Sequence, residues 1–538
     1  MKLEQIEIPV KNPLLDDYRN EKSSILSFFH YPNRAESFSK RLEDLQNHPI
    51  RRGQLVAIIR GFMEPLEISN KAEKHLQELE DNAVVIVGGQ QSGLLTGPLY
   101  SVHKAISVIL LAKEQRENLG IPVVPVFWIA GEDHDIDEIN HTFTAVNGRL
   151  VKHVYGERSK RKTMASTTQI DVEMTRKFIS ETFKQYGETV YTEKLLANID
   201  ALLKMSTTYT DFFVQIMNWL FKEEGLLFID ASNPKLREYE APYFEKLIQH
   251  SEAIANVVTI REANLAELGY GAPIGATKEA ANLFYVKDGE RFLLERHDGK
   301  FINHMANVQF TKSEMLQLAK EDPTCLSNNV VTRPLMQDMV LPVLAFVGGP
   351  GELAYWSTLK DAFETLDMQV PVFVPRMNIT IVDRQVQVVL HELQISVADA
   401  IAGKTSTLKT SYEDEVYDTD AKKVIEQTKQ LLHSQYEGLQ EHLLNNKVHL
   451  EKLVDKNLIY HESQLDFLMG KIEQEILLKH EVELRKYRII EDCILPGGGL
   501  QERTFNPFQF MNEYGEDLVK ELMTLPFSIN GKHNVVFL

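Results

Sequence analysis

The sequence predicts an α/β protein with a Rossmann-like parallel-sheet core, inserted helical connecting segments and a long antiparallel α-helical coiled coil. Three observations lead to this prediction. Five short apolar runs are each followed by a polar or glycine-rich loop, which is the pattern of strands in a buried parallel sheet. Helical patterns separate most of these runs. Near the C-terminal end, a stretch without proline carries leucine at near-heptad spacing.

The predicted strands share β-branched and aromatic content, and they span 84–87, 123–129, 226–229, 343–347 and 370–374. The loops after them read GGQQSG, AGEDHD, DASNPK, GGPGE and PRMN. In an open parallel sheet, ligands bind where the loops at the carboxyl ends of the strands converge. We therefore expect the functional groups of these loops to lie together.

The segments inserted between the strands have helical and hairpin patterns. Apolar periodicity predicts helices over 174–186, 193–205, 208–222 and 239–254. Two Asp-Gly dipeptides between residues 282 and 302, flanked by aromatic and aliphatic residues, predict a β-hairpin.

The stretch from Arg376 to Leu495 contains no proline, and its leucine repeat predicts two long helices joined near 455–458. Such a hairpin has too little core to stand alone. It either pairs with a second copy of the chain or packs on the body of its own chain. We expect a homodimer formed through the coiled coil.

These patterns divide the chain into consecutive segments. We expect the first part of the core at 1–170, a mainly helical insertion with a β-hairpin and one core strand at 171–310, and the second part of the core at 311–383. The coiled-coil hairpin follows at 384–495, and a segment at 496–538 returns to the core.

Composition restricts the class of protein. A formal charge of −19 over 538 residues argues against a nucleic-acid partner. The chain has no apolar run long enough to span a membrane and no apolar signal segment at its start, so we expect a cytoplasmic protein. Two distant cysteines, Cys325 and Cys493, fit a reducing compartment and argue against a zinc site in this chain.

The first loop carries neutral hydrogen-bonding side chains beside a helix start. Gln90, Gln91, Ser92, Gly93 and Thr96 are predicted to bind substrate. The loop matches neither the G-x-G-x-x-G dinucleotide fingerprint nor a phosphate-binding P-loop. Ordinary turn chemistry is the alternative.

The second loop gathers acidic groups around a histidine directly after a strand. Because clustered like charges raise one another's pKa, such groups often serve acid–base chemistry. We expect His134, Asp133 and Asp135 to be catalytic and Glu132 to contact substrate. The cluster also suits Mg²⁺ beside a nucleotide, and a solvated acidic loop is the alternative.

The third loop repeats the pattern with a GGPG turn before a helix. Gly348, Gly349, Gly351 and Glu352 are predicted to bind nucleotide. Arg376, which follows the last strand, is expected to bind substrate through a carboxylate or a phosphate; Arg333 and Arg384 are further candidates for a local basic pocket.

The segment LPGGGLQER after the coiled coil has two interpretations. Spacing alone favours a linker that returns the chain to the core. A second nucleotide site is the other interpretation, and its predicted residues are Gly497, Gly498, Gly499, Arg503 and Asn506.

Four motifs in this order, VGGQQSGLLTGPLY, WIAGEDHDIDEI, FVGGPGELAYW and LPGGGLQER, resemble the BshC family, the cysteine-adding enzymes of bacillithiol biosynthesis. The resemblance covers essentially the whole chain. It implies a Rossmann core with connecting insertions, a coiled-coil dimerisation element and a cytoplasmic location. It also implies a reaction, the ligation of cysteine to glucosaminyl-malate.

Joining a carboxylate to an amine requires activation of the carboxylate, and ATP with Mg²⁺ is the simplest source. Related synthetases hold the sulfur of cysteine through a zinc bound by Cys and His. This chain lacks both the cysteines for such a site and an HxGH motif, so we expect no zinc. A different nucleotide-using transferase on the same core and a non-catalytic coiled-coil scaffold are the alternative functions.

Overall fold

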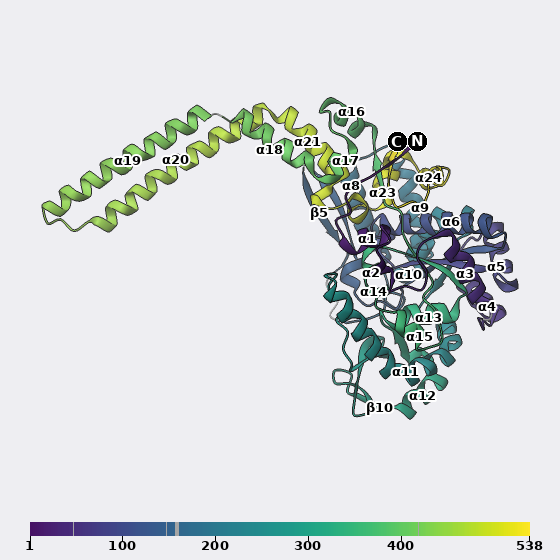
Figure 1. Ribbon diagram of the computed structural model, residues 1–538. Helices are drawn as coiled ribbons and strands as arrows, with labels where there is room; N and C mark the ends of the chain where they lie inside the picture. Colours follow the sequence, from purple (N-terminus) through teal and green to yellow (C-terminus); the bar gives the residue numbers. More distant parts are fainter. Residues whose placement is uncertain (47, 147, 157–160, 418) are drawn as a thin grey trace. The chain divides into compact units, whose positions relative to one another are not determined.

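The computed structural model describes residues 1–538 except 47, 147, 157–160 and 418 (Figure 1). The chain divides into two compact units. The first unit comprises residues 1–144, 150–381 and 499–538, and the second comprises 145–149 and 382–498. The segment 382–498 therefore interrupts the first unit in sequence.

The core of the first unit is a five-stranded parallel sheet. Its order is β13 (Val372–Pro375), β12 (Val343–Gly348), β2 (Val84–Gln90), β3 (Val123–Ile129) and β6 (Leu227–Asp230), and all neighbours are parallel. In chain order this is the 3-2-1-4-5 arrangement of a Rossmann sheet. The prediction of one parallel sheet from five strands is confirmed, with strand ends that differ by at most three residues.

Burial on both faces explains why these strands have continuous apolar runs. Val85, Ile86 and Val87 in β2 are completely buried, as are most residues of β3 and β12. Helix α6 (Tyr100–Leu119) packs against β2 and β3, while α3 (Ala35–Leu45) packs against β12 and β13. The chain leaves β2 towards β3 and later returns to β12 on the other side. The switch point of the sheet thus lies between β2 and β12.

Helices connect the strands where the sequence predicted them. They are α8 (Val172–Tyr186), α9 (Thr192–Lys204), α10 (Tyr209–Phe221) and α11 (Pro234–Glu267). Thr208 and Asp211 form a capping box at the start of α10. Helix α11 starts earlier than predicted because Asn233 caps it and Pro234 occupies its first turn, where proline costs no hydrogen bond, and it continues past the predicted end to Glu267.

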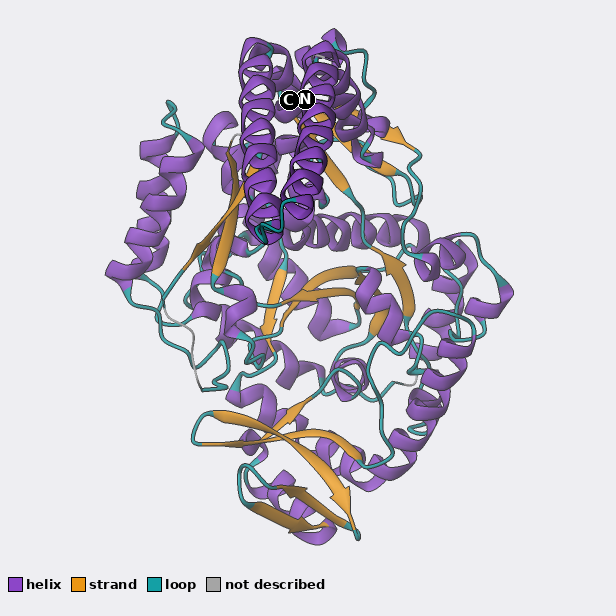
Figure 2. Ribbon diagram, turned by 90° about the vertical axis from the view of Figure 1, so that its left-hand side faces the viewer, coloured by secondary structure: helices purple, strands orange, loops and turns teal. Residues whose placement is uncertain are grey.

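The predicted hairpin is confirmed as part of a larger antiparallel sheet. The sheet order is β10 (Val308–Thr311), β9 (Lys300–Asn303), β8 (Glu290–His297), β7 (Ala280–Lys287) and β11 (Leu326–Asn328), visible as the crossing arrows at the bottom of Figure 2. Both Asp-Gly dipeptides have positive φ at both residues, as a two-residue hairpin turn requires.

A third sheet joins the two ends of the chain. Strand β1 (Lys2–Ile6) pairs antiparallel with β15 (His533–Phe537), and β15 lies beside β14 (Ile379–Val382). A two-stranded sheet is formed by β4 (His141–Val146) and β5 (Arg149–Val154).

The other helices assigned to the first unit are shorter, and most cover the sheets or connect strands. They are α1 (Pro13–Arg19), α2 (Ser23–Leu26), α4 (Arg52–Met63), α5 (Asn70–Asp81), α7 (Ile136–Ile139), α12 (Lys312–Glu321), α13 (Thr332–Val340), α14 (Pro350–Trp356), α15 (Lys360–Glu364), α22 (Gln501–Thr504), α23 (Pro507–Tyr514) and α24 (Leu518–Leu522).

The second unit is helical. Its helices are α16 (Arg384–Glu392), α17 (Val397–Ala402), α18 (Lys404–Val416), α19 (Thr419–Asn445), α20 (Glu451–Lys479) and α21 (Glu481–Ile494). Helices α19 and α20 run side by side in Figure 1. Lys429 contacts Asp466 at 2.6 Å and His433 contacts Glu462 at 2.7 Å, a register that only antiparallel helices allow.

The position predicted for the junction of the two long helices is wrong. The chain turns at 446–450 rather than at 455–458. Lys447 takes the left-handed conformation there, with φ of 58°. Neither glycine nor proline marks this turn, and its compositional signal is the pair Asn445 and Asn446 directly before Lys447, since asparagine favours turns.

No helix in the described part of the chain has both the length and the apolar character needed to cross a bilayer.

Candidate active site

A cavity of about 530 Å³ opens at the carboxyl ends of the central strands, and we call it the larger cavity. The ends of β2 and the turn after β12 both contribute to its walls, so it lies at the switch point of the sheet. Its lining consists of Gly89, Gln90, Gln91, Tyr100, Lys104, Trp128, Ala130, Asp133, Glu138, Arg333, Gly349, Pro350, Gly351, Glu352, Tyr355, Arg376 and Arg503. Residues from seven separate parts of the sequence therefore meet at one place.

Lys104 on α6 holds the two sides of the switch point together. Its buried Nζ donates to Gly89 O at 2.6 Å, Gln90 Oε1 at 3.0 Å and Glu352 Oε2 at 2.6 Å, which satisfies all three of its donors. The same Glu352 oxygen accepts the Gly349 N–H at 2.8 Å. Burial lowers the pKa of Lys104, and the Glu352 carboxylate opposes that shift. The end of β2 and the start of α14 are thus fixed by one ammonium group.

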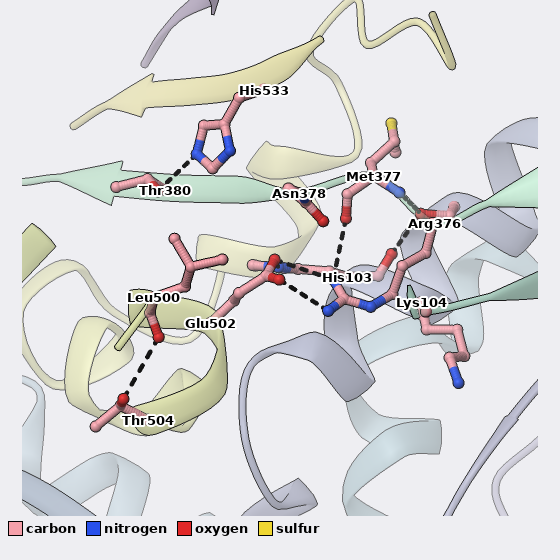
Figure 3. A network of polar contacts seen from close by, with 12 residues as sticks. His103, Lys104, Arg376, Met377, Asn378, Thr380, Leu500, Glu502, Thr504 and His533 are labelled. Atoms are coloured by element: carbon pink, nitrogen blue, oxygen red, sulfur yellow. Dashed lines mark hydrogen bonds and ion pairs between the residues drawn. The ribbon is translucent and has the colours of Figure 1, made fainter. Parts of the chain in front are cut away.

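Arg376, which follows β13, is held by a buried carboxylate. Its guanidinium donates to Glu502 through two bonds of 2.9 and 2.8 Å (Figure 3). Burial alone would raise the pKa of Glu502, but the charge of Arg376 and hydrogen bonds from His103 and Arg376 outweigh it and lower that pKa well below its usual range. Arg376 is therefore a compensated cation at the wall of the cavity.

Two histidines extend this network away from the cavity. The Nδ1 atom of His103 lies 3.2 Å from Glu502 Oε2, and His533 Nε2 lies 2.8 Å from Thr380 Oγ1 (Figure 3). Burial lowers the pKa of His533 to about 4, so its ring is neutral at pH 7. The strand β15 near the end of the chain thus supports the wall of the site.

Two further cations of the larger cavity have no acidic partner among the described residues. The Arg333 guanidinium donates to the Tyr355 hydroxyl, and burial raises the pKa of Tyr355 to about 12. The Arg503 guanidinium lies 5.9 Å from the centre of the Tyr100 ring. Uncompensated guanidinium groups in a cavity are suited to carboxylate or phosphate.

The glycines at the strand ends are required by packing. A Cβ on Gly348 would lie 2.5 Å from Phe373 Cζ, and a Cβ on Gly89 would collide with the Trp128 carbonyl. Gly349 and Gly351 are not confined in this way, because their nearest neighbours lie at 3.6 Å or beyond 4 Å. The close packing of the strands, rather than a ligand, accounts for the first two glycines.

The structure brings about half of the predicted residues to the larger cavity. Gln90, Gln91, Asp133, Gly349, Gly351, Glu352, Arg376 and Arg503 line it. Asp133 accepts a hydrogen bond from Gln91 at 2.7 Å, which joins the first loop to the second.

Other residues of the first loop support its backbone. Ser92 is buried and its hydroxyl lies 3.0 Å from Thr210 Oγ1. Thr96 is buried, and Leu95 and Thr96 have φ of 52° and 72°, a strained conformation for such residues. Gly93 lines a smaller neighbouring cavity. The substrate-binding role predicted for Ser92 and Thr96 stays a prediction to which the geometry adds no support.

Glu132 lies apart from the larger cavity. Its buried carboxylate accepts from the Arg237 guanidinium, from Ser327 Oγ at 2.6 Å and from Asn328 N at 3.3 Å. Glu240 also binds Arg237, and burial raises its pKa to about 8. Glu132 is thus the ionised partner of a buried arginine, so its side chain is engaged within the protein.

His134 and Asp135 are not among the residues that line the larger cavity. His134 Nδ1 accepts from Arg291 at 3.2 Å, and burial together with the Arg291 charge lowers the pKa of His134. Asp135 is exposed. The catalytic roles of His134, Asp133 and Asp135 stay predictions, and only Asp133 lines the cavity.

The glycine segment after the coiled coil is divided between the units. Gly497 and Gly498 belong to the second unit and Gly499 to the first, which agrees with the linker interpretation. Asn506 caps α23 by accepting the Phe508 N–H at 2.9 Å, and its amide donates to Thr142 at 2.7 Å. Of the five residues predicted for a second nucleotide site, Arg503 alone lines the larger cavity, and that site stays a prediction.

Sequence reasoning missed several residues that shape the site, namely Tyr100, Lys104, Trp128, Glu138 and Glu502. A signal for Lys104 existed, because it is a lone cation among Val102, Ile106 and Val108 in a helix buried along most of its length. A buried lysine requires acceptors nearby. No comparable signal pointed to Glu502, whose partner lies 126 residues away.

Among the residues that the structure describes, no group of three or more His, Cys, Asp or Glu side chains is arranged to hold a metal ion. The acidic second loop is spread over several contacts: Glu132 faces Arg237, Asp133 faces Gln91, and Asp135 is exposed. A bound Mg²⁺ would therefore need ligands from elsewhere, such as the phosphates of a nucleotide.

Comparisons with known proteins cover the whole chain. Residues 1–377 match the family model described as "Bacillithiol biosynthesis BshC, N-terminal Rossmann-like domain", and residues 379–538 match the "C-terminal coiled-coil domain" of the same family. A relative from Lysinibacillus sphaericus is 52% identical over all of both chains, and one from Bacillus cereus strain Q1 is 38% identical over all of both chains. Both carry the name "Putative cysteine ligase BshC".

Proposed function

Because the chain belongs to the BshC family of bacillithiol biosynthesis, we propose that it is a cysteine ligase that joins the carboxyl group of cysteine to the amine of glucosaminyl-malate. The product is an amide. The larger cavity at the switch point is the place where this reaction is proposed to occur.

One observation carries the proposal: two of the four cations in the larger cavity have no acidic partner among the described residues. Lys104 is paired with Glu352 and Arg376 with Glu502, whereas Arg333 and Arg503 form no ion pair with a described carboxylate. The malate portion of the substrate carries two carboxylates. The two unpaired guanidinium groups match carboxylates of the two substrates in charge and in hydrogen-bonding geometry, with Arg333 suited to malate and Arg503 to cysteine.

Carboxylate activation by ATP completes the proposed reaction. An oxygen of the cysteine carboxylate would attack ATP to form an acyl-adenylate with loss of pyrophosphate, or an acyl-phosphate with loss of ADP. The amine of the sugar would then form the C–N bond, lose a proton and release AMP or phosphate. The cationic walls and the open backbone at Gly349 and Gly351 support binding of phosphates. Both cysteines are free, and we place the reaction in the cytoplasm.

Dimerisation through the coiled coil is a further part of the proposal. Many large apolar side chains of α19 and α20 are exposed, among them Leu431 at 66% and Phe467 at 61%. A two-helix hairpin with such a surface gains stability by covering it with a second copy. Light scattering should give twice the chain mass, and Leu431→Glu with Phe467→Glu should give a monomer. The matched control Val190→Glu, at an exposed position of the first unit, should leave the dimer intact.

The reaction is tested by mass spectrometry of purified protein with Mg-ATP, cysteine and glucosaminyl-malate. We expect bacillithiol together with either AMP or ADP. Absence of product from folded protein that binds nucleotide would contradict the proposal.

Charge variants test whether the larger cavity is the site. Arg333→Gln should raise KM for glucosaminyl-malate and Arg503→Gln should raise KM for cysteine, each roughly 10- to 100-fold, because each removes a charge-assisted contact. Arg384→Gln is the matched control, since Arg384 is exposed on α16 and does not line the cavity. Equal kinetics for all three variants would place the substrate elsewhere.

A further inference from the structure

A smaller cavity of about 180 Å³ adjoins the larger one. The two share Gln90, Gln91, Tyr100, Glu138 and Arg503, so they meet along a common rim. The remaining walls come from the turn before α6, from the start of α6, from the segment at the start of β4 and from α22; they comprise Gly93, Gly97, Pro98, Ser101, Ile139, His141, Thr142, Phe143 and Thr504. The smaller cavity is below the size that drug-sized ligands occupy, and it suits a small molecule.

One buried hydroxyl at this cavity has no hydrogen-bond partner in the described part of the chain. Ser101 is 1% exposed, and its Oγ forms no hydrogen bond with any described residue. Ser107, on the same helix, shows the usual situation: its Oγ donates to His103 O at 2.7 Å and accepts the Met377 N–H at 3.0 Å. A buried polar atom without a partner is costly and rare in folded proteins. The Ser101 hydroxyl is thus available to a ligand in the smaller cavity.

The shared rim carries one group of each charge. Arg503 forms no ion pair with a described carboxylate, and its guanidinium lies against the Tyr100 ring. The exposed carboxylate of Glu138 accepts from Gln91 Nε2 at 3.0 Å and faces no described cation at ion-pair distance. A guanidinium and a carboxylate at one rim complement the carboxylate and ammonium of a free α-amino acid.

We propose that the smaller cavity is the amino-acid subsite, in which Arg503 binds the α-carboxylate, Glu138 binds the α-ammonium and Ser101 faces a small polar side chain. This rests on the proposed function, and it makes cysteine the occupant. The new bond forms at the carboxyl carbon of cysteine, so that group must face the second substrate. Binding of the charged end at the shared rim meets this requirement, while the side chain is enclosed in the smaller cavity.

Direct binding of L-cysteine to the full-length protein tests the subsite. Titration calorimetry measures the affinity, with a phosphine reductant that keeps the cysteine thiol reduced. It is carried out with and without a non-hydrolysable ATP analogue, so that binding is also detected if the site forms only after nucleotide has bound. We expect L-cysteine to bind, L-alanine to bind more weakly and L-tryptophan not to bind. Ser101→Ala should weaken L-cysteine binding roughly 5- to 30-fold, and Glu138→Gln at least 10-fold.

Two matched controls separate ligand contacts from structural effects. Glu117→Gln, at an exposed position on α6, should leave the affinity for L-cysteine unchanged. Ser107→Ala should lower the stability of the protein without changing that affinity, whereas Ser101→Ala should change the affinity without lowering the stability. The reverse pattern would show that the Ser101 hydroxyl serves the fold.

The subsite and the proposed function fail in different ways. Product formation by wild-type protein, with L-cysteine affinity unchanged in Ser101→Ala and Glu138→Gln, would overturn the subsite and leave the ligase intact. Variant-sensitive binding of L-cysteine without any product would support the subsite and contradict the ligase. No binding of L-cysteine in either nucleotide condition would overturn the subsite.

Discussion

Removal of the carboxylate behind Arg376 should destabilise the first unit strongly. Arg376 and Glu502 are 4% and 3% exposed at their side chains and share two hydrogen bonds. Glu502→Gln leaves the guanidinium buried without its countercharge. Breaking one partner of a buried ion pair costs about 3–5 kcal/mol, so we expect a loss of that size in the free energy of unfolding.

The expected loss has a defined pH dependence. Because the pKa of Glu502 is lower in the folded than in the unfolded protein, its contribution is complete above the ordinary glutamate pKa of about 4.3 and is lost as the pH falls towards the folded value. The difference between wild-type protein and Glu502→Gln should therefore be constant at neutral pH. It should shrink when both proteins are measured in acid.

Tryptophan fluorescence during urea unfolding is a suitable assay. The three tryptophans, Trp128, Trp219 and Trp356, all belong to the first unit, so the signal reports that unit alone. The double variant Arg376→Met with Glu502→Gln removes both charges and should cost several kcal/mol less than the sum of the two single variants. If the two single variants had additive effects on the free energy of unfolding, or if Glu502→Gln lowered it by less than about 1 kcal/mol, the buried ion pair would not have the expected stabilising role.

Three other predictions concern buried ionisable groups. The folded pKa of His533 is about 4, so protonation favours the unfolded chain, and the free energy of unfolding of wild-type protein should fall by about 3 kcal/mol between pH 6.5 and 4. His533→Asn should abolish this fall, which urea unfolding across that pH range measures. Glu132→Gln should lower the free energy of unfolding by about 3 kcal/mol at pH 7. Glu240→Gln should change it by less than about 1 kcal/mol, because Glu240 has a pKa of about 8 and is already protonated at pH 7. Equal losses for the two variants would contradict this assignment of charge. Lys104→Met should abolish turnover and lower stability, and adding Glu352→Gln should restore stability but not turnover, as unfolding and product assays can show.

Local sequence pattern was sufficient to predict the core strands. A buried parallel strand needs a continuous apolar run, and each of the five runs formed such a strand. The convergence of the first and third loops could also be predicted, since the carboxyl ends of parallel strands lie at one edge. Asp133 and Gln91 meet for the same reason.

The partners of the site residues could not be predicted from pattern. Glu502 and Arg376 lie 126 residues apart, and the coiled coil intervenes between them in sequence. In the acidic second loop, residues that are adjacent in sequence were predicted to form one cluster. The fold instead directs Glu132 and Asp133 to different neighbours. Side-chain direction after a strand depends on tertiary contacts that spacing does not encode.

The pairing of β1 with β15 has a consequence for the timing of folding. Residues 2–6 leave the ribosome long before their partners at 533–537 are made. At synthesis rates of about 5–20 residues per second, β1 waits roughly half a minute to two minutes for its partner. During that interval β1 is an unpaired strand open to association with other chains. Glu502 and Arg503 also emerge late, so a nascent chain has no complete site until its coiled coil has been synthesised.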